Sequence, residues 1–206
     1  LTFYFQGTLH YSAIRTGIAF LPFSVGIVVG ATVASRIMPR IGPRLLMAGG
    51  FALGAVGLAL FTMVGVHSAY FAHIFPEELI VSLGMGASFV PLSSTALVGV
   101  DPGDAGVASA MVNTTQQTGG ALGVSLLNTI AASATTGYLA AHGASAAARA
   151  AAAVHGYTTA FTVSGALLAT AAISALLILR ATRHDVPRDD PGTEPTGVAE
   201  VALAEA

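Results

Sequence analysis

The chain has 206 residues, of which 54% are hydrophobic and 9% are charged, and its mean hydropathy is +0.75. Because soluble domains carry about 25% charged residues, this composition argues against a soluble enzyme. The absence of cysteine excludes disulfides and thiolate metal or redox sites, and no basic cluster is available to bind nucleic acid. HExxH, GxSxG and P-loop patterns are also missing. We therefore predict no enzymatic activity, no cofactor and no metal site.

Charged residues are missing from five long runs, residues 16–35, 45–76, 79–100, 105–148 and 150–179. A helix of about 20 residues crosses a hydrocarbon core of about 30 Å, and the runs lack the polar–apolar alternation of barrel strands. The sequence therefore predicts an all-α integral membrane domain over residues 1–183. Its complete spans are expected at residues 16–36, 45–65, 78–99, 105–133 and 157–180.

Residues 1–11, LTFYFQGTLHY, are predicted to be the end of a sixth helix. The chain starts at Leu1 rather than Met, inside an apolar aromatic stretch, and has no basic segment typical of a signal peptide. We interpret the sequence as a C-terminal fragment of a larger membrane protein.

Glycines and prolines recur inside the predicted spans. Three GxxxG spacings each clear one face of a helix, so that a neighbouring helix can approach closely; they are Gly26/Gly30, Gly50/Gly54 and Gly119/Gly123. Pro22 and Pro91 can kink their helices because proline lacks a backbone N–H. These features favour close static packing, and the alternative is that smooth faces and kinks let helices move during a transport cycle.

The arginines predict the orientation of the chain. Six of the eight fall on one side of this topology, namely Arg36, Arg40, Arg44, Arg180, Arg183 and Arg188. Arg15 and Arg149 fall on the other side. The positive-inside rule then places the 36–44 loop, the 100–104 loop and the C-terminus in the cytoplasm. Loops 66–77 and 134–156 are expected outside.

No acidic or basic residue lies deep in a predicted span. The carboxylates sit at span edges, and they are Glu77, Glu78, Asp101 and Asp104. Because intramembrane acids are the usual proton-relay groups, Glu78 is the best proton-coupling candidate in this chain. A deeper carboxylate would have to lie in the missing part of the protein.

The span at residues 105–133 is the most polar. Asn113, Gln117, Gly120, Val124 and Asn128 follow a three-or-four spacing and share one face. Because amides facing lipid would cost several kcal/mol each (about 2–7), this face is expected to look inward. It would either hydrogen-bond to another helix or line a substrate path.

The segments after residue 133 are read as connection, last span and tail. The alanine-dominated stretch 140–153 is interpreted as a low-complexity connection, and the alternatives are an external helix or a long frayed end of a neighbouring helix. Histidines without ligand spacing are interpreted as surface or interface residues, namely His67, His73, His142 and His155. The tail, residues 184–206, holds one arginine and six acidic residues and is predicted to be disordered and cytoplasmic.

Two stretches carry recognisable motifs. In residues 1–50 they are Gln6, Gly17, Pro22 and the RxxxRxGxR run of Arg36, Arg40, Gly42 and Arg44. In residues 84–131 a glycine-rich helix ends near a proline, and an acidic turn is followed by A-G-x-A-S and N-T-x-x-Q-x-G-G-A-L-G. Together they resemble the C-terminal half of major facilitator superfamily drug exporters, and specifically the 14-helix drug:proton antiporters of the QacA/EmrB type.

Two positions depart from the family pattern. Pro39 stands where the loop usually has an Asp before its second arginine, which argues against a charge-relay gating role for this loop. Gln116 stands where many relatives have an arginine, so a cationic interaction is absent there.

The resemblance covers about residues 1–183 and implies the last six helices of a transporter whose two six-helix halves rock around a central cavity. The first half and two linker helices would be missing. Since one half cannot enclose the cavity, we expect that this fragment alone does not transport.

We therefore predict the C-terminal part of a proton-driven multidrug or metabolite efflux pump, multi-pass in the plasma membrane. Its partners would be the lipid bilayer, small lipophilic or cationic substrates, protons and the missing N-terminal half. The predicted substrate contacts are the polar Asn113, Gln116, Gln117 and Asn128 and the apolar Phe20, Phe23, Met85 and Phe89. Arg36, Arg40 and Arg44 would anchor a cytoplasmic gate. The alternatives are an uptake symporter of the same superfamily and a non-transporting membrane scaffold or subunit.

Overall fold

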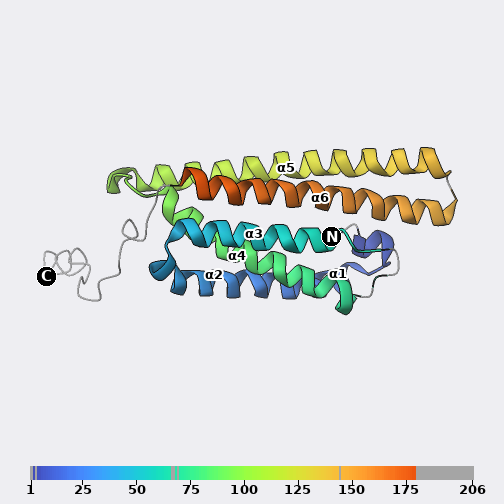
Figure 1. The fold of residues 1–206 in the computed structure, drawn as a ribbon, viewed down its shortest axis with the longest axis horizontal. Helices are drawn as coiled ribbons and strands as arrows, with labels where there is room; N and C mark the ends of the chain where they lie inside the picture. Colours follow the sequence, from blue (N-terminus) through green and yellow to red (C-terminus); the bar gives the residue numbers. More distant parts are fainter. Residues whose placement is uncertain (1, 3, 66–67, 69, 144, 180–206) are drawn as a thin grey trace, which may run out of the picture.

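The computed structural model describes residues 2, 4–65, 68, 70–143 and 145–179, and every regular element among them is helical. The long helices lie roughly side by side (Figure 1). In chain order the elements are η1 (Tyr4–Thr8), α1 (Ala13–Ala19), α2 (Leu21–Ile41), α3 (Pro43–Phe61), η2 (Tyr70–Ile74), α4 (Phe75–Ala96), η3 (Pro102–Asp104), α5 (Ala105–His142) and α6 (Ala146–Ile178).

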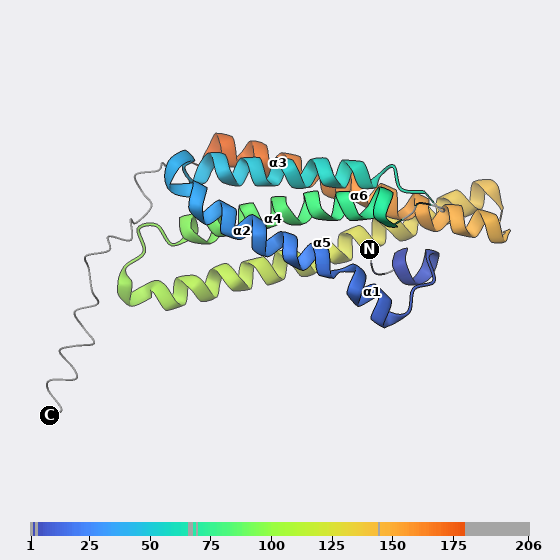
Figure 2. The same cartoon turned by 90° about the horizontal axis from the view of Figure 1, so that it is seen from below.

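Helix α4 packs against both α2 and α3, and α6 packs against both α3 and α5. Helix α5 therefore lies at one side of the bundle, where α6 is its main neighbour (Figures 1 and 2). Short connections make consecutive long helices antiparallel. This order leaves most of the surface of α5 uncovered by the described residues.

Four stretches of the described residues are long and apolar enough to cross a membrane, and they are Ala13–Ile41, Pro43–Phe61, Tyr70–Ala96 and Ala146–Ile178. Large apolar side chains on their outer faces are exposed, for example Val28 and Leu177. Such exposure suits a lipid environment, where burial from water is not required. Helix α5 was predicted as a further span, but its polar side chains keep it outside these four.

The helices begin and end elsewhere than the charge pattern predicts. The predicted 36–44 loop is helical apart from one residue, because α2 continues to Ile41 and α3 begins at Pro43. Gly42 makes the turn with a φ of 82°, a value that glycine adopts without strain, and Pro43 suits the first helical position. The turn is therefore a single residue rather than a loop.

The predicted 134–156 loop is also mostly helical. Helix α5 runs to His142, and α6 begins at Ala146 with Ser145 as its N-cap, whose hydroxyl accepts a hydrogen bond from Ala148 N at 3.2 Å. Residues 140–142 and 146–153 thus belong to the ends of α5 and α6, so the interpretation as a long end of a neighbouring helix fits better than a low-complexity connection. The tail and the three arginines from residue 180 onward lie outside the described residues.

In the N-terminal segment Thr2 is helical and Tyr4–Thr8 form a π-helical turn, η1. After it, α1 ends at Ala19 and α2 begins at Leu21, so that Phe20 marks a break two residues before Pro22. Pro22 has no N–H to continue the hydrogen-bond ladder across this point. By contrast, α4 runs on through Pro91.

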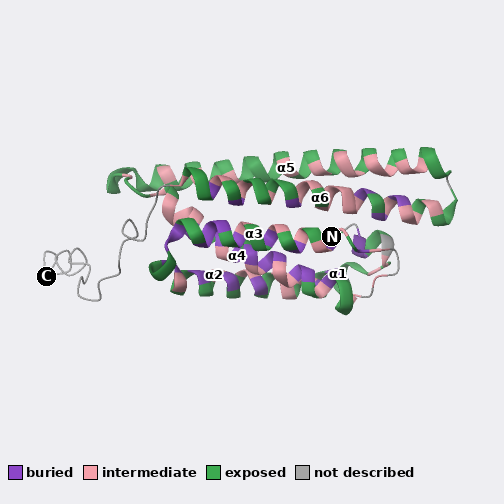
Figure 3. Ribbon diagram, in the orientation of Figure 1, coloured by how far each residue is buried: buried purple, intermediate pink, exposed green. Residues whose placement is uncertain are grey.

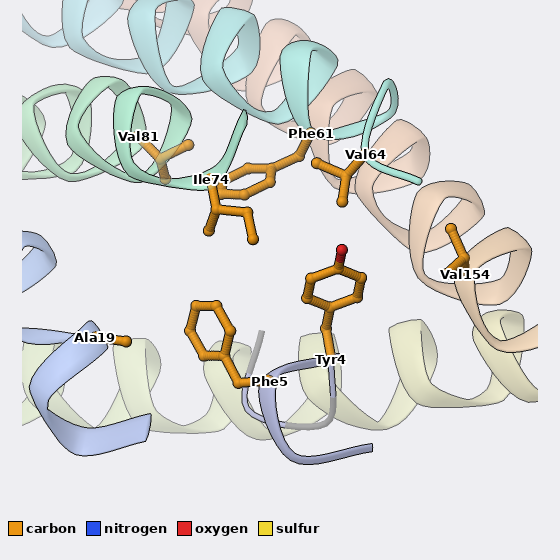
Figure 4. Packing of buried hydrophobic residues seen from close by; sticks show 8 residues of the cluster. All are labelled: Tyr4, Phe5, Ala19, Phe61, Val64, Ile74, Val81 and Val154. Carbon is orange, nitrogen blue, oxygen red and sulfur yellow. The ribbon is translucent and has the colours of Figure 1, made fainter. Parts of the chain in front are cut away.

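The largest buried cluster lies at the end of the bundle where η1, α1 and η2 meet. Figure 4 shows Tyr4 and Phe5 pointing from η1 toward side chains of α3, of the loop after α3 and of η2. Tyr4 also donates a hydrogen bond from its phenol to Gly65 O at 2.8 Å. The cluster consists of Tyr4, Phe5, Ala19, Phe61, Val64, Ile74, Val81 and Val154.

Glycines let α4 approach α2 and α3 at backbone distance. A Cβ atom added to Gly84 of α4 would lie 2.6 Å from both Gly50 O and Gly54 N of α3. On the other face of α4, Gly86 lies against the α2 backbone, and Gly30 of α2 lies against Leu83. A Cβ atom at Gly119 or Gly123 of α5 would meet open space among the described residues. The close seams therefore run along α4, and buried residues concentrate there (Figure 3).

Candidate functional site

The polar face of α5 is exposed in this chain. Asn113, Gln117 and Asn128 all lie on the uncovered surface of the helix, and α5 has no fully buried residue (Figure 3). Among the described residues, the end of α4 approaches this face only near Asn113. The face that was predicted to line a substrate path is therefore largely open in this chain.

A cavity of about 150 Å³ lies between the end of α4 and the start of α5. It is formed because the turn around η3 folds α5 back beside α4. The cavity brings together three predicted substrate residues, the Phe89 ring and the amides of Asn113 and Gln116. Its other lining residues are Ser93, Leu97, Ser109 and Val112.

Ser93 and Ser109 were not predicted as site residues. The sequence carries a signal for them, since residues 89, 93 and 97 are spaced by four and lie on one face of a helix. The short acidic turn that follows implies an antiparallel partner. Which face of that partner meets residues 89–97 depends on the helix rotations in the folded chain.

The other predicted substrate residues lie elsewhere. Phe20 and Phe23 pack against the buried cluster at the opposite end of the bundle, with their ring centroids 6.4 Å apart. Met85 is exposed on α4, and Gln117 and Asn128 are exposed on α5. Of the eight predicted contacts, the structure thus gathers three into one cavity.

The arginines separate along the bundle. Arg36 and Arg40 are exposed in the last turns of α2, and Arg44 is exposed in the first turn of α3. The Arg44 guanidinium donates a hydrogen bond to Leu176 O in the last turn of α6. A cation is favourable at a helix C-terminus because the carbonyl ends of the helix are partly negative. This contact ties the start of α3 to the end of α6.

The opposite end of the bundle carries Arg15 and Arg149. Arg15 of α1 holds its guanidinium over the Tyr11 ring, 4.0 Å from the ring centroid. Arg149 lies near the start of α6. The antiparallel helices therefore place these two arginines away from Arg36, Arg40 and Arg44.

Two buried carboxylates lie in the first turn of α4. Glu78 is 0% exposed, and its Oε2 atom lies 3.3 Å from the Tyr70 hydroxyl. The same hydroxyl lies 2.7 Å from Ala19 O. Among the described residues, Glu78 Oε1 and Glu77 Oε2 are buried without a hydrogen-bond partner. Tyr70 was not predicted as a functional residue, and its sequence position eight residues before Glu78 offers no motif.

An open groove of about 510 Å³ lies beside Tyr70 at the break between α1 and α2. It is rich in aromatic rings and contains one cation, Arg15. The residues that line it are Tyr11, Arg15, Ile18, Ala19, Pro22, Tyr70, Phe71 and Phe75. The groove gives the buried Glu78–Tyr70 pair a route to the surface through Tyr70.

Two of the histidines lie against an aromatic ring. His142 stacks on Tyr138 at 4.1 Å between ring centroids, and His155 lies 5.3 Å from the same ring. No group of three histidine, aspartate or glutamate side chains within the described part of the chain could hold a metal ion. His67 lies outside the described residues.

Comparison with known proteins gives consistent matches. The sequence model of the Major Facilitator Superfamily matches residues 1–124. The puromycin resistance protein pur8 of Streptomyces alboniger is 46% identical over 182 residues, which cover 86% of this chain and 36% of that protein. The cephamycin export protein CmcT of Amycolatopsis lactamdurans is 40% identical over 138 residues, 66% of this chain and 28% of that protein.

A third relative is the multidrug resistance protein B homolog of Mycobacterium tuberculosis, 31% identical over 128 residues. That match covers 62% of this chain and 24% of the relative. Across these relatives, the chain spans between 24% and 36% of their length.

Proposed function

Because the chain belongs to the major facilitator superfamily, we propose that it is the C-terminal part of a proton-coupled drug efflux pump of the 14-helix type. The observation that carries this proposal is the 46% identity over 86% of the chain to a puromycin resistance protein. Relatives named for cephamycin export and multidrug resistance support the same class. Membership of this family and four apolar helices identify a multi-pass membrane protein and a transporter family rather than an enzyme family.

The arginine distribution supports an orientation. Arg36, Arg40 and Arg44 lie at one end of the bundle, so the positive-inside rule assigns that end to the cytoplasm. Because α6 ends beside Arg44, the C-terminus would leave the membrane on the same side. In this orientation the contact between Arg44 and α6 would help to close the cytoplasmic end of the bundle.

The exposed polar face of α5 is proposed to line the substrate path together with the N-terminal half of the transporter. An amide-bearing face that the described helices leave largely open would be unfavourable against lipid, but it suits a water-filled cavity between two halves. The cavity of Phe89, Asn113 and Gln116 would form part of the wall. An aromatic ring beside two amides suits small lipophilic compounds that carry a few polar groups.

Transport by the full-length protein tests this function. We would reconstitute it in liposomes that are acidic inside and add puromycin or ethidium outside. An antiporter exchanges internal protons for external drug, so both compounds should accumulate, and accumulation should stop when the gradient is collapsed. Absence of drug movement and of coupled proton loss would disprove efflux, and accumulation only with acid outside would instead indicate uptake by symport.

Gln116→Ala tests the cavity in the same liposomes. Loss of one amide hydrogen bond of about 0.5–1.5 kcal/mol should raise the half-saturating drug concentration by roughly two- to tenfold. Thr129→Ala is the matched control, because Thr129 lies away from the face of Asn113, Gln117 and Asn128, and its hydroxyl donates to Ser125 O of its own helix at 2.9 Å. Equal effects of the two variants would contradict the placement of substrate near Gln116.

A further inference from the structure

The hydroxyl group of Tyr70 lies close to two oxygen atoms at once. It is 2.7 Å from Ala19 O and 3.3 Å from Glu78 Oε2. A phenol has a single O–H, and a backbone carbonyl can only accept. At 2.7 Å the contact with Ala19 has the usual length of an O–H···O hydrogen bond. If the phenol donates its one proton to Ala19 O, the contact with Glu78 can be a hydrogen bond only when the Glu78 carboxyl is protonated and donates to the Tyr70 oxygen.

The Ala19 carbonyl belongs to the break between α1 and α2. Ala19 is the last residue of α1, and no backbone N–H of the described residues donates to its carbonyl across the break. Kinks of this kind leave carbonyls that need a donor from outside the helix. Tyr70, which precedes α4 in the chain, supplies that donor. The break is visible at the N-terminal end of α2 in Figure 2.

No cationic side chain of the described residues forms a hydrogen bond with Glu78. Its side chain is completely buried, and Oε1 has no hydrogen-bond partner among the described residues. The titratable or charged groups of the surrounding elements are Tyr4, Tyr11, Arg15, Tyr70, His73, Glu77 and Tyr157. Arg15 holds its guanidinium over Tyr11 instead. A buried carboxylate without a partner is strongly unfavourable, whereas the neutral acid is not.

We propose that Glu78 is a proton-binding residue and that Tyr70 is its positioning residue, which together latch the α1–α2 break to α4. With a proton on Glu78, the acid donates to the Tyr70 oxygen and the phenol donates to Ala19 O. When the proton leaves to water in the groove beside Tyr70, the phenol turns to the carboxylate, because bonds to a charged acceptor are stronger. The Ala19 carbonyl then loses its donor, and the break is released.

The coupling of this latch to drug movement rests on the proposed function, but the proton site itself does not require transport. Infrared difference spectroscopy of the full-length protein in phosphatidylethanolamine–phosphatidylglycerol liposomes tests the site directly. A protonated buried carboxyl has its own C=O stretching band, and this band should titrate with pH in the wild type. It should be lost in Glu78→Gln, and it should change frequency in Tyr70→Phe, which removes its hydrogen-bond partner.

Glu77→Gln is the matched control, since it removes the adjacent buried carboxyl and leaves the Tyr70 contacts in place. This variant should keep the band that Tyr70→Phe shifts. A Glu78→Gln spectrum identical to that of the wild type, or a band that ignores Tyr70→Phe, would overturn the proposal. These results do not depend on whether any drug is moved.

Opening of the α1–α2 break can also be measured by hydrogen exchange. The protection factor of the amides in residues 20–24, which corrects the exchange rate for base catalysis, should fall at high pH in the wild type and should be low at all pH values in Tyr70→Phe. Tyr157→Phe, which removes another phenol near the same cluster, should leave exchange at the break unchanged. In liposomes, Glu78→Gln should retain drug exchange without a gradient and lose gradient-driven accumulation. A protection factor at the break that is independent of both pH and Tyr70 would refute the latch.

Discussion

Two adjacent glycines of α3 differ in whether a larger side chain would fit in their place. A Cβ atom added to Gly50 would lie 2.7 Å from Gly84 O and 2.9 Å from Ser88 N of α4, whereas one added to Gly49 would meet nothing within 4 Å. The GxxxG spacing in the sequence singles out Gly50 and Gly54 but does not identify their partner. The partner, Gly84, is not part of a GxxxG pair, so this spacing does not single it out in the sequence.

Gly50→Ala should therefore destabilise the protein by about 1–3 kcal/mol, because the added methyl group forces the α3 and α4 backbones apart. Gly49→Ala should be neutral or stabilising by up to about 1 kcal/mol, since alanine is the better helix former. Unfolding of the full-length protein in mild detergent, followed by circular dichroism, measures both. Equal behaviour of the two variants would contradict the close approach of α3 and α4.

At the scale of the helices, the charge pattern locates each element but misplaces its ends. Arg36 and Arg40 belong to α2, although they were predicted to lie in a loop. The reason is physical: charges mark where the hydrocarbon region ends, whereas a helix can continue into water until a residue such as Gly42 turns the chain. The same reasoning explains why α5 and α6 extend through the predicted 134–156 loop.

The hydrogen bond from Arg44 to Leu176 O joins two helices that are far apart in sequence. Arg44→Ala should loosen the last turn of α6, which has free carbonyls like any helix end. For an exposed side chain the loss should be about 0.5–1 kcal/mol, so amide exchange in residues 173–179 should rise roughly two- to fivefold.

Hydrogen–deuterium exchange of the full-length protein in nanodiscs measures this effect. Arg40→Ala is the control, because Arg40 is an exposed arginine at the same end of the bundle and forms no such contact with the described residues. If Arg40→Ala loosens α6 as much as Arg44→Ala, the contact has no specific role.

At the scale of the whole molecule, the antiparallel order of the helices divides the chain into two ends. The turn after α4 lies with Arg36, Arg40 and Arg44, and the turn after α5 lies at the opposite end with Arg149. The sequence predicts this division from charge alone. Each membrane crossing carries the chain to the other side, so successive connections between helices alternate between the two ends.

The chain contains no cysteine, so none of its own residues competes with a single cysteine introduced to report the topology. In intact cells, a membrane-impermeant maleimide should label Ala141→Cys and should label Gly103→Cys only after permeabilisation. Both positions are exposed and lie at opposite ends of α5. Labelling of both cysteines from outside would show that α5 does not cross the membrane, and the reverse pattern would invert the proposed orientation.

The sequence by itself determined that the chain is helical and membrane-embedded, roughly where its long helices lie and which superfamily it belongs to. These properties follow from transfer energies that add along the chain and from local motifs, so they need no tertiary contacts. Only the tertiary structure decided that Phe89 meets Asn113 and Gln116, that Gly84 meets α3, and that Tyr70 lies between Ala19 and Glu78. Such contacts depend on how each helix is rotated and where it crosses its neighbour, and helical periodicity alone specifies neither.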